Sequence, residues 1–390
     1  MYTGSLLLSV VVTTALAFAF TNGFHDTANA MATSIVTGAL RPHSAVALGA
    51  TLNFLGAFLS LQVAATIAQG IVDAGAITLT VIFAGLVGGM VWNLVTWYLG
   101  MPTSSSHALI GGVVGAAFIA AGASAVKGHG LLTKVLIPAL LSPLAAGFVA
   151  VVGTSLVYLI TRNVPGRIRD RGFRIGQIGS ASLVSLAHGT NDAQTTMGVV
   201  TLALIVDHTV GATASPPTWV VVSSAAALAL GTYVGGWRII RTVGKGLTEI
   251  RNPQGFSAES ASAALILATS HHGFPLSTTQ VCCGSIVGAG AGRRPAGVRW
   301  GMVTRLVALW LITLPAAALV GAAAWLGARL IGGVQGVAVV FVMALIIALE
   351  LYVAADLKPV NASNVNAVWR SEPEPSSGDA EATPTEGPAP

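Results

Sequence analysis

The chain has 390 residues, of which 54% are hydrophobic and only 8% are charged. A soluble domain carries about 25% charged residues, so this composition excludes an ordinary water-soluble protein. The formal net charge of +5 derives mainly from arginine-rich loops, which report topology in a membrane protein rather than nucleic-acid binding. Apolar runs of roughly 20 residues recur along the chain, and each is long enough to cross a bilayer. We therefore predict an all-α polytopic membrane protein.

The apolar segments predict about ten to twelve membrane segments in chain order. Their approximate ranges are 5–40 (interrupted by polar residues), 44–69, 76–99, 103–124, 133–160, 177–206, 218–240, 257–270, 276–292, 298–326 and 332–356. The predicted organisation is a first membrane repeat (1–160), a basic cytoplasmic loop (161–176), a second membrane repeat (177–326), a final membrane helix (327–358) and a tail (359–390). The tail is rich in Pro, Ser and Glu, so we predict a disordered acidic cytoplasmic segment.

Two loops are strongly basic. The stretch 161–174 contains five arginines, and 238–251 contains Arg238, Arg241, Lys245 and Arg251. Short loops rich in Lys and Arg stay in the cytoplasm, and two spans separate these two loops. We therefore predict a multi-pass protein of the cytoplasmic membrane with its N-terminus outside and its C-terminus in the cytoplasm.

The sequence also repeats itself. "FHDTANAM" (24–31) aligns with "TNDAQTTM" (190–197), and "PTSSSHALIGGVVGA" (102–116) aligns with "PLSTTQVCCGSIVGA" (275–289). Two motif pairs in the same order indicate an internal duplication. In the predicted topology the two copies run in opposite directions, which is a common transporter architecture.

The first motif pair places Asp26 and Asp192 within membrane segments. A charge there costs about 2.5–3.5 kcal/mol on insertion scales and is tolerated where it faces a polar cavity or binds a cation. Helices broken at these motifs would free carbonyl oxygens, which with both carboxylates and the Asn29 amide would suit Na⁺ or H⁺. A structural pair is the alternative, with His25 and His188 as local partners; for His25, structural hydrogen bonding and proton handling both remain open.

The second motif pair places a hydroxyl triplet after a proline in each half. A lone cluster of this kind usually bonds to its own helix backbone. Here the proline breaks the preceding turn, so the hydroxyls are expected to begin and cap a new helix. A helix N-terminus with clustered hydroxyls binds anions, and phosphate needs many such donors. The triplets are Ser104, Ser105 and Ser106 in the first half, and Ser277, Thr278 and Thr279 in the second.

These motifs resemble the paired signatures of the inorganic phosphate transporter (PiT) family. The resemblance rests on "NGFHDTANAMATSIVTGALR", "MPTSSSHALIGG", "AHGTNDAQTTMG" and "FPLSTTQVCCGSIVGA" and extends from about residue 5 to 356. It implies a secondary transporter of inorganic phosphate, built from inverted repeats with broken helices and two re-entrant hairpins. It also implies coupling to Na⁺ or H⁺, possible transport of phosphate as a complex with a divalent metal, and a possible homodimer.

The resemblance also implies roles for individual residues. The coupling-ion centre would comprise Asp26, Asn29, Asp192, Asn191 and Glu259, for which an interfacial charge is the alternative role. The six hydroxyls of the triplets would hold phosphate on the hairpin tips, and we place Thr195 with them. His25 stands where relatives commonly have Asn. The form "GFHDTANA" is shared with the bacterial low-affinity branch and favours H⁺.

Three rival functions remain at this level. The first is transport of another tetrahedral oxyanion, such as sulfate. The second is an intramembrane aspartyl enzyme using Asp26 and Asp192, which the density of small amides and hydroxyls in both motifs disfavours. The third is a channel or nutrient receptor. We predict a protein that is not an enzyme, with no cofactor, no resident metal and no nucleic-acid partner; its partners are phosphate, a coupling cation and the lipid bilayer.

Overall fold

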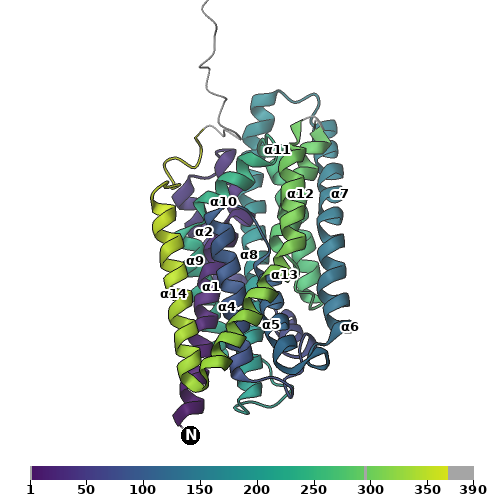
Figure 1. The fold of residues 1–390 in the computed structure, drawn as a ribbon. Coiled ribbons are helices and arrows are strands. Elements are labelled where there is room, and N and C mark those ends of the chain that lie inside the picture. Colours follow the sequence, from purple (N-terminus) through teal and green to yellow (C-terminus); the bar gives the residue numbers. More distant parts are fainter. Residues whose placement is uncertain (1, 294–296, 368–390) are drawn as a thin grey trace, which may run out of the picture.

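The computed structural model describes residues 2–293 and 297–367, and Figure 1 shows them as a bundle of long helices. The described residues contain no β-strand, only two isolated β-bridges, Val72–Val126 and Thr248–Val298. The elements are α1 (Tyr2–Val36), α2 (Pro42–Gly56), α3 (Gln62–Gly70), α4 (Leu79–Tyr98), α5 (Ser105–Ala121), η1 (Ala123–Ala125), α6 (Gly128–Leu131), η2 (Leu132–Leu136), α7 (Ile137–Ile160), α8 (Gly166–Val206), α9 (Thr218–Val234), α10 (Trp237–Arg241), η3 (Thr242–Gly246), α11 (Asn252–His271), α12 (Thr278–Arg293), α13 (Trp300–Ile331) and α14 (Gly333–Asp356).

Within the described residues, five helical stretches are long and apolar enough to cross a membrane: Leu6–Val36, Leu79–Tyr98, Gly128–Ile160, Trp300–Ile331 and Gly333–Asp356. The bent pair formed by α9 and α10–η3, with an angle of 61° between its parts, would make a sixth. The other segments predicted from the sequence are also helical, but they are shorter or more polar. Thus α5 has 17 residues and α12 has 16, fewer than the ~20 that span a bilayer.

The helices that carry the two aspartates are continuous. α1 runs through Asp26 and α8 runs through Asp192 without a break, so the expectation that these motifs break their helices is wrong. Neither motif contains a proline that would break the helix. The glycine in each motif allows a neighbouring helix to pack closely. A Cβ on Gly23 would lie 2.1 Å from a carbonyl oxygen of α9, and one on Gly189 would lie 2.1 Å from a carbonyl oxygen of α2. Side chains, rather than freed backbone carbonyls, must therefore supply the ligands at this level.

The same close contacts recur at matching positions of the two halves. A Cβ on Gly115 of α5 would lie 2.1 Å from the carbonyl oxygen of Ala318 on α13. A Cβ on its counterpart in the second half, Gly288 of α12, would lie 2.1 Å from the carbonyl oxygen of Gly147 on α7. The second helix of each hairpin thus packs on the last long helix of the opposite half. This recurrence supports the internal duplication proposed from the sequence.

The apolar core has two clusters, and the polar centre lies between them along both central helices. In α1 the residues up to Phe18 belong to one cluster and those from Ala28 to the other. In α8 the order is reversed, because Ala187 belongs to the second cluster and Ala193 to the first. α1 and α8 therefore run in opposite directions past the same level, as Figure 1 also shows. This arrangement supports inverted repeats.

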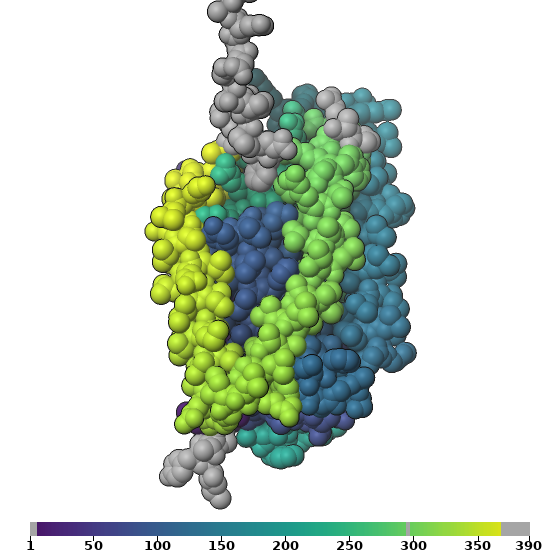
Figure 2. All heavy atoms as spheres, in the orientation of Figure 1, coloured from purple at the N-terminus to yellow at the C-terminus, as the bar shows by residue number. Residues whose placement is uncertain are grey.

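Two helical hairpins approach this level from opposite ends of the bundle. α4 and α5 form one hairpin and α11 and α12 form the other, with the prolines Pro102 and Pro275 in the non-helical tips. α5 occupies the lower part of Figure 1, whereas α12 occupies the upper part. α13 and α14 diverge from their junction at the bottom of the view and frame α4, whose blue surface is visible between them in Figure 2.

The basic elements gather at one end of the bundle, together with the segment that follows α14. The α7–α8 loop, α10 and the end of α14 lie at the top of Figure 1, opposite the N-terminus. Arg238 donates to the carbonyl oxygens of Ala355 and Lys358 at 2.6 and 2.7 Å, and Val365 is fully buried. Residues 359–367, which the sequence analysis assigned to the tail, therefore pack on the bundle; the rest of the predicted tail, 368–390, lies outside the described residues.

Candidate functional site

The first half of the site is built on α1. His25 and Asp26 are buried, and Nδ1 of His25 lies 2.7 Å from Oδ1 of Asp26. Nε2 of the same imidazole lies 3.1 Å from the hydroxyl of Thr96 on α4. One turn further along α1, the amide of Asn29 donates to Thr278 at 3.3 Å and to Thr279 at 3.0 Å. The face of α1 that carries the motif is therefore joined to both hairpins.

The second half is built on α8 by related contacts. The amide of Asn191 donates to the carbonyl oxygen of Leu276 in the second hairpin tip at 2.7 Å. His188, one turn before Asp192, has Nε2 3.5 Å from Oδ2 of that carboxylate. Nδ1 of His188 lies 3.1 Å from Oδ1 of Asn53 on α2. Each aspartate therefore has a histidine of its own helix beside it, at the preceding residue in α1 and four residues earlier in α8.

Each hairpin tip contacts the aspartate of the other half. The hydroxyl of Thr279 in the second hairpin donates to Oδ1 of Asp26 at 3.2 Å. The hydroxyl of Ser106, its counterpart in the first hairpin, lies 3.5 Å from Oδ1 of Asp192. These crossed contacts place four elements, α1, α8 and both tips, around one buried centre.

Asp26, His188 and Asp192 form the centre of this arrangement. One ligand atom from each of these buried residues lies within 4.8 Å of the other two. Two carboxylates so close together are stabilised by a shared cation, which can be a proton on the cluster or a bound metal ion. Oxygen and imidazole ligands suit both choices, so the donor set fits a coupling cation without selecting one.

The hydroxyl triplets divide into two helix caps and four hydroxyls that contact the residues of the centre. Ser104 accepts a hydrogen bond from the backbone N–H of His107, and Ser277 accepts one from Gln280, both at 3.2 Å. These two residues cap α5 and α12, as Pro-preceded hydroxyls were expected to do. The next hydroxyls, Ser105 and Thr278, remain beside the α1 motif: Ser105 lies 3.5 Å from Nδ1 of His25, and Thr278 accepts from Asn29.

Glu259 was expected in the coupling-ion centre, but its hydrogen-bond partners form a separate polar cluster. Glu259 lies on α11, and its two carboxylate oxygens accept hydrogen bonds from four buried side chains. These donors are Thr33 (2.5 Å) and Ser34 (2.9 Å) of α1, and Gln177 (3.2 Å) and Ser180 (2.6 Å) of α8. The contacts link three helices on the basic side of the aspartates. Thr195, placed with the phosphate-binding hydroxyls, contacts the backbone oxygen of Asn191 in its own helix, at 3.4 Å.

Sequence reasoning missed the residues of α4 that hold the first histidine. Thr96 contacts His25, and Thr103 donates to Thr96 at 2.9 Å. The buried amide of Asn93 was also missed. A single amide inside an apolar run, as in "MVWNLV", was the available signal. The His188–Asp192 pair was readable from its spacing, because residues four apart share one face of a helix.

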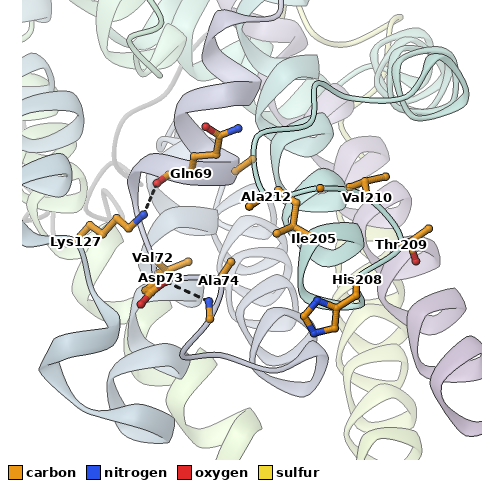
Figure 3. Close-up of a pocket in the computed structure, with 13 residues that line it drawn as sticks. Gln69, Val72, Asp73, Ala74, Lys127, Ile205, His208, Thr209, Val210 and Ala212 are labelled. Carbon is orange, nitrogen blue, oxygen red and sulfur yellow. Dashed lines mark hydrogen bonds between the residues drawn. The ribbon is translucent and has the colours of Figure 1, made fainter.

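A cavity of about 600 Å³ lies apart from this centre, between the outer ends of α3 and α8. Figure 3 shows its lining, in which Lys127 donates to the carbonyl oxygen of Gln69 at 2.7 Å. Asp73 and His208 lie on opposite sides of the space. None of the site residues predicted from the sequence lines it. Its mixed charges do not form the dense donor set found at the hairpin tips.

The described fold and site define a class of protein. An all-helical membrane bundle with a buried cluster of carboxylates and imidazole between two helical hairpins is the construction of a secondary transporter. Comparison with known families then narrows the class: the model of the phosphate transporter family (PHO4) matches residues 22–321. The chain belongs to this phosphate transporter family, whose members are transporters rather than enzymes, and the resemblance stated above is confirmed.

Individual relatives agree with this assignment. A protein of Mycobacterium tuberculosis (strain ATCC 25618 / H37Rv) called a probable low-affinity inorganic phosphate transporter is 58% identical over 93% of this chain and 87% of its own length. A protein of the same name from Bacillus subtilis is 44% identical over 82% of this chain and 96% of its own length. A solved structure described as the sodium-dependent phosphate transporter superposes with a TM-score of 0.75 at 24% identity, covering 84% of this chain and all of that one.

Proposed function

We propose that this protein imports inorganic phosphate together with H⁺ by alternating access across the cytoplasmic membrane. The crossed contacts of Thr279 with Asp26 and of Ser106 with Asp192 carry the proposal. They place hydroxyl donors for an oxyanion directly beside carboxylates that need a positive charge. Protonating the carboxylates would lower the electrostatic cost of bringing phosphate beside them.

The choice of H⁺ draws support from the two histidines. Each aspartate has a buried imidazole neighbour, His25 for Asp26 and His188 for Asp192, and an imidazole has one ring nitrogen that can donate a proton and one that can accept it. Na⁺ is the second candidate, because the same oxygens are hard ligands. The three residues Asp26, His188 and Asp192 also suit a divalent cation travelling with phosphate. A homodimer implied by the family resemblance stays a prediction.

The proposed orientation places the N-terminus outside and the basic end of the bundle in the cytoplasm. The α7–α8 loop, α10 and the residues after α14 share that end, as the positive-inside rule requires. In this orientation the hairpin α4–α5 enters from the outer side and α11–α12 from the inner side. Each ends at the level of the aspartates, which is the expected geometry of two re-entrant hairpins.

Reconstituted uptake tests the coupling ion. We expect proteoliposomes to accumulate radioactive phosphate against its gradient when the lumen is alkaline relative to the outside, with no Na⁺ present. Accumulation driven only by a Na⁺ gradient at equal pH would replace H⁺ by Na⁺. Excess sulfate should leave the uptake unchanged, whereas strong competition by sulfate would change the proposed cargo. Equilibration without accumulation under either gradient would indicate a channel.

The hydroxyls of Ser105 and Thr278, which do not cap a helix, should determine the affinity for phosphate. We expect Ser105→Ala and Thr278→Ala each to raise the apparent KM for phosphate about tenfold, because a hydrogen bond to a charged group contributes ~1.5–3 kcal/mol. Initial uptake rates over a range of phosphate concentrations measure this. Thr51→Ala is the control, since Thr51 is an exposed hydroxyl that bonds only its own helix. An unchanged KM in both tip variants would move the phosphate site away from the hairpins.

A further inference from the structure

Two amide side chains on the outer side of the site have no hydrogen-bond partner. Asn22 of α1 is fully buried and Asn93 of α4 is 1% exposed. Within the described residues, neither the oxygen nor the nitrogen of either amide meets a partner. Burying an amide without a hydrogen bond is unfavourable, so groups of this kind in proteins ordinarily bind ordered water. Among the described residues, these are the two asparagines whose amide oxygen and nitrogen are both buried and unpaired.

The two amides belong to one seam between α1 and α4. Apolar residues from the first part of each helix pack in the same cluster, and His25 meets Thr96 further along, so the helices run in the same direction. The rings of Phe24 and Trp97, with centroids 5.4 Å apart, mark the same register. Asn22 lies three residues before His25 on α1, and Asn93 lies three residues before Thr96 on α4. In parallel helices, positions three apart form successive layers of one seam, so the amides form the layer directly outside His25.

The layer beyond the amides is apolar. Phe18 lies one turn before Asn22 on α1 and is fully buried. Gly89 lies one turn before Asn93 on α4, and α5 packs against it. On the opposite side of the aspartates, Glu259 has all its hydrogen bonds supplied by protein groups. In the described part of the chain, single buried atoms of Asn29, His188 and Gln280 also lack a hydrogen-bond partner, whereas in Asn22 and Asn93 both amide atoms do.

We propose that Asn22 and Asn93 bind ordered water one helical turn outside His25, and that this hydrated seam is the route by which the outer solution reaches Asp26. An amide both donates and accepts, so the pair can hold water in a continuous hydrogen-bonded line toward the imidazole. Displacement of Phe18 from the seam opens this line to the outside. The sidedness rests on the proposed function, whereas the hydration of the seam does not depend on the coupling ion.

Cysteine labelling tests the route directly. In a background with Cys282→Ala and Cys283→Ala, the variants Asn22→Cys and Asn93→Cys are embedded in vesicles of known orientation. We expect a small membrane-impermeant methanethiosulfonate applied at the outer face to modify both, as read from the mass of the intact protein. Saturating phosphate should slow the reaction. Leu94→Cys is the matched control, because Leu94 is a buried neighbour on α4 that lies outside the seam; it should stay unmodified.

A second variant guards against an uninformative result. Asn22→Leu combined with Asn93→Leu keeps the branched shape and the number of side-chain heavy atoms and removes the water partners. We expect the initial rate of uptake to fall roughly tenfold, with equilibrium binding of radioactive phosphate to the purified protein unchanged. Resistance of both cysteines to the reagent, labelling only from the inner face, or undiminished uptake by the double variant would overturn the proposal. Labelling is independent of transport, so its failure leaves the phosphate symport assignment standing.

Discussion

Replacing either central aspartate should abolish coupled phosphate uptake. We expect Asp26→Asn and Asp192→Asn each to reduce uptake to the level of vesicles without protein. The two carboxylates and His188 form one cluster, so removing either charge eliminates the site for the coupling cation. An amide keeps the shape of the residue and one acceptor oxygen but cannot take up a proton. Initial rates of radioactive phosphate uptake under an imposed ion gradient measure the effect.

The controls for this result concern folding and specificity. Asp73→Asn changes an exposed carboxylate outside the centre and should transport normally. Both central variants should elute as a single species in detergent with the yield of the parent protein, because burying a neutral amide is less costly than burying a charge. Uptake near the parental rate in either variant would remove that aspartate from the mechanism.

Filling the helix contact at Gly288 should prevent stable folding. We expect Gly288→Leu to abolish the monodisperse folded species, because a Cβ there would lie 2.1 Å from the carbonyl oxygen of Gly147 and 2.7 Å from its Cα. Overpacking typically costs ~1–3 kcal/mol when side chains can adjust. Here the obstacle is the backbone of α7, so α12 and its hairpin tip would have to move. Thermal unfolding of the purified protein, followed by size-exclusion chromatography, measures the loss.

The chain supplies a matched control for this substitution. Gly301 lies near the start of another long helix, α13, and a Cβ there would meet nothing within 4 Å. Gly301→Leu should therefore leave the unfolding temperature almost unchanged. If both leucine variants unfolded at the same temperature as the parent, the packing of the second hairpin on α7 would differ from the one described.

Local chemistry explains what could be predicted from the sequence. The hairpin tips were predictable because Pro102 and Pro275 stop one helix and the following hydroxyl caps the next, which is decided within a few residues. The pairing of Asp26 with Asp192 was predictable because the duplicated motifs align. The expected break in α1 and α8 was wrong because glycine has two uses: it weakens a helix, but it also admits a neighbouring backbone, as at Gly23.

Contacts between distant elements explain what could not be predicted. No pattern in the sequence shows that Thr279 reaches the aspartate of the other half, since this depends on how the hairpins cross. Glu259 was assigned to the coupling centre because it is a carboxylate near the second hairpin. It lies on α11, whose register turns it toward Thr33 and Ser180 instead. A charge in a membrane segment thus indicates a polar environment without identifying its partners.

The reciprocal contacts between tips and carboxylates have a consequence for leakage. Either half of the protein could move on its own only by breaking the contact between its aspartate and a hydroxyl of the opposite half. Such interlocking favours the two halves moving as a pair, once phosphate and its cation have replaced the bonds that are broken. A protein that has bound only one of the two substrates would then change slowly between its outward-open and inward-open states. The coupling ion would therefore not leak across the membrane without phosphate.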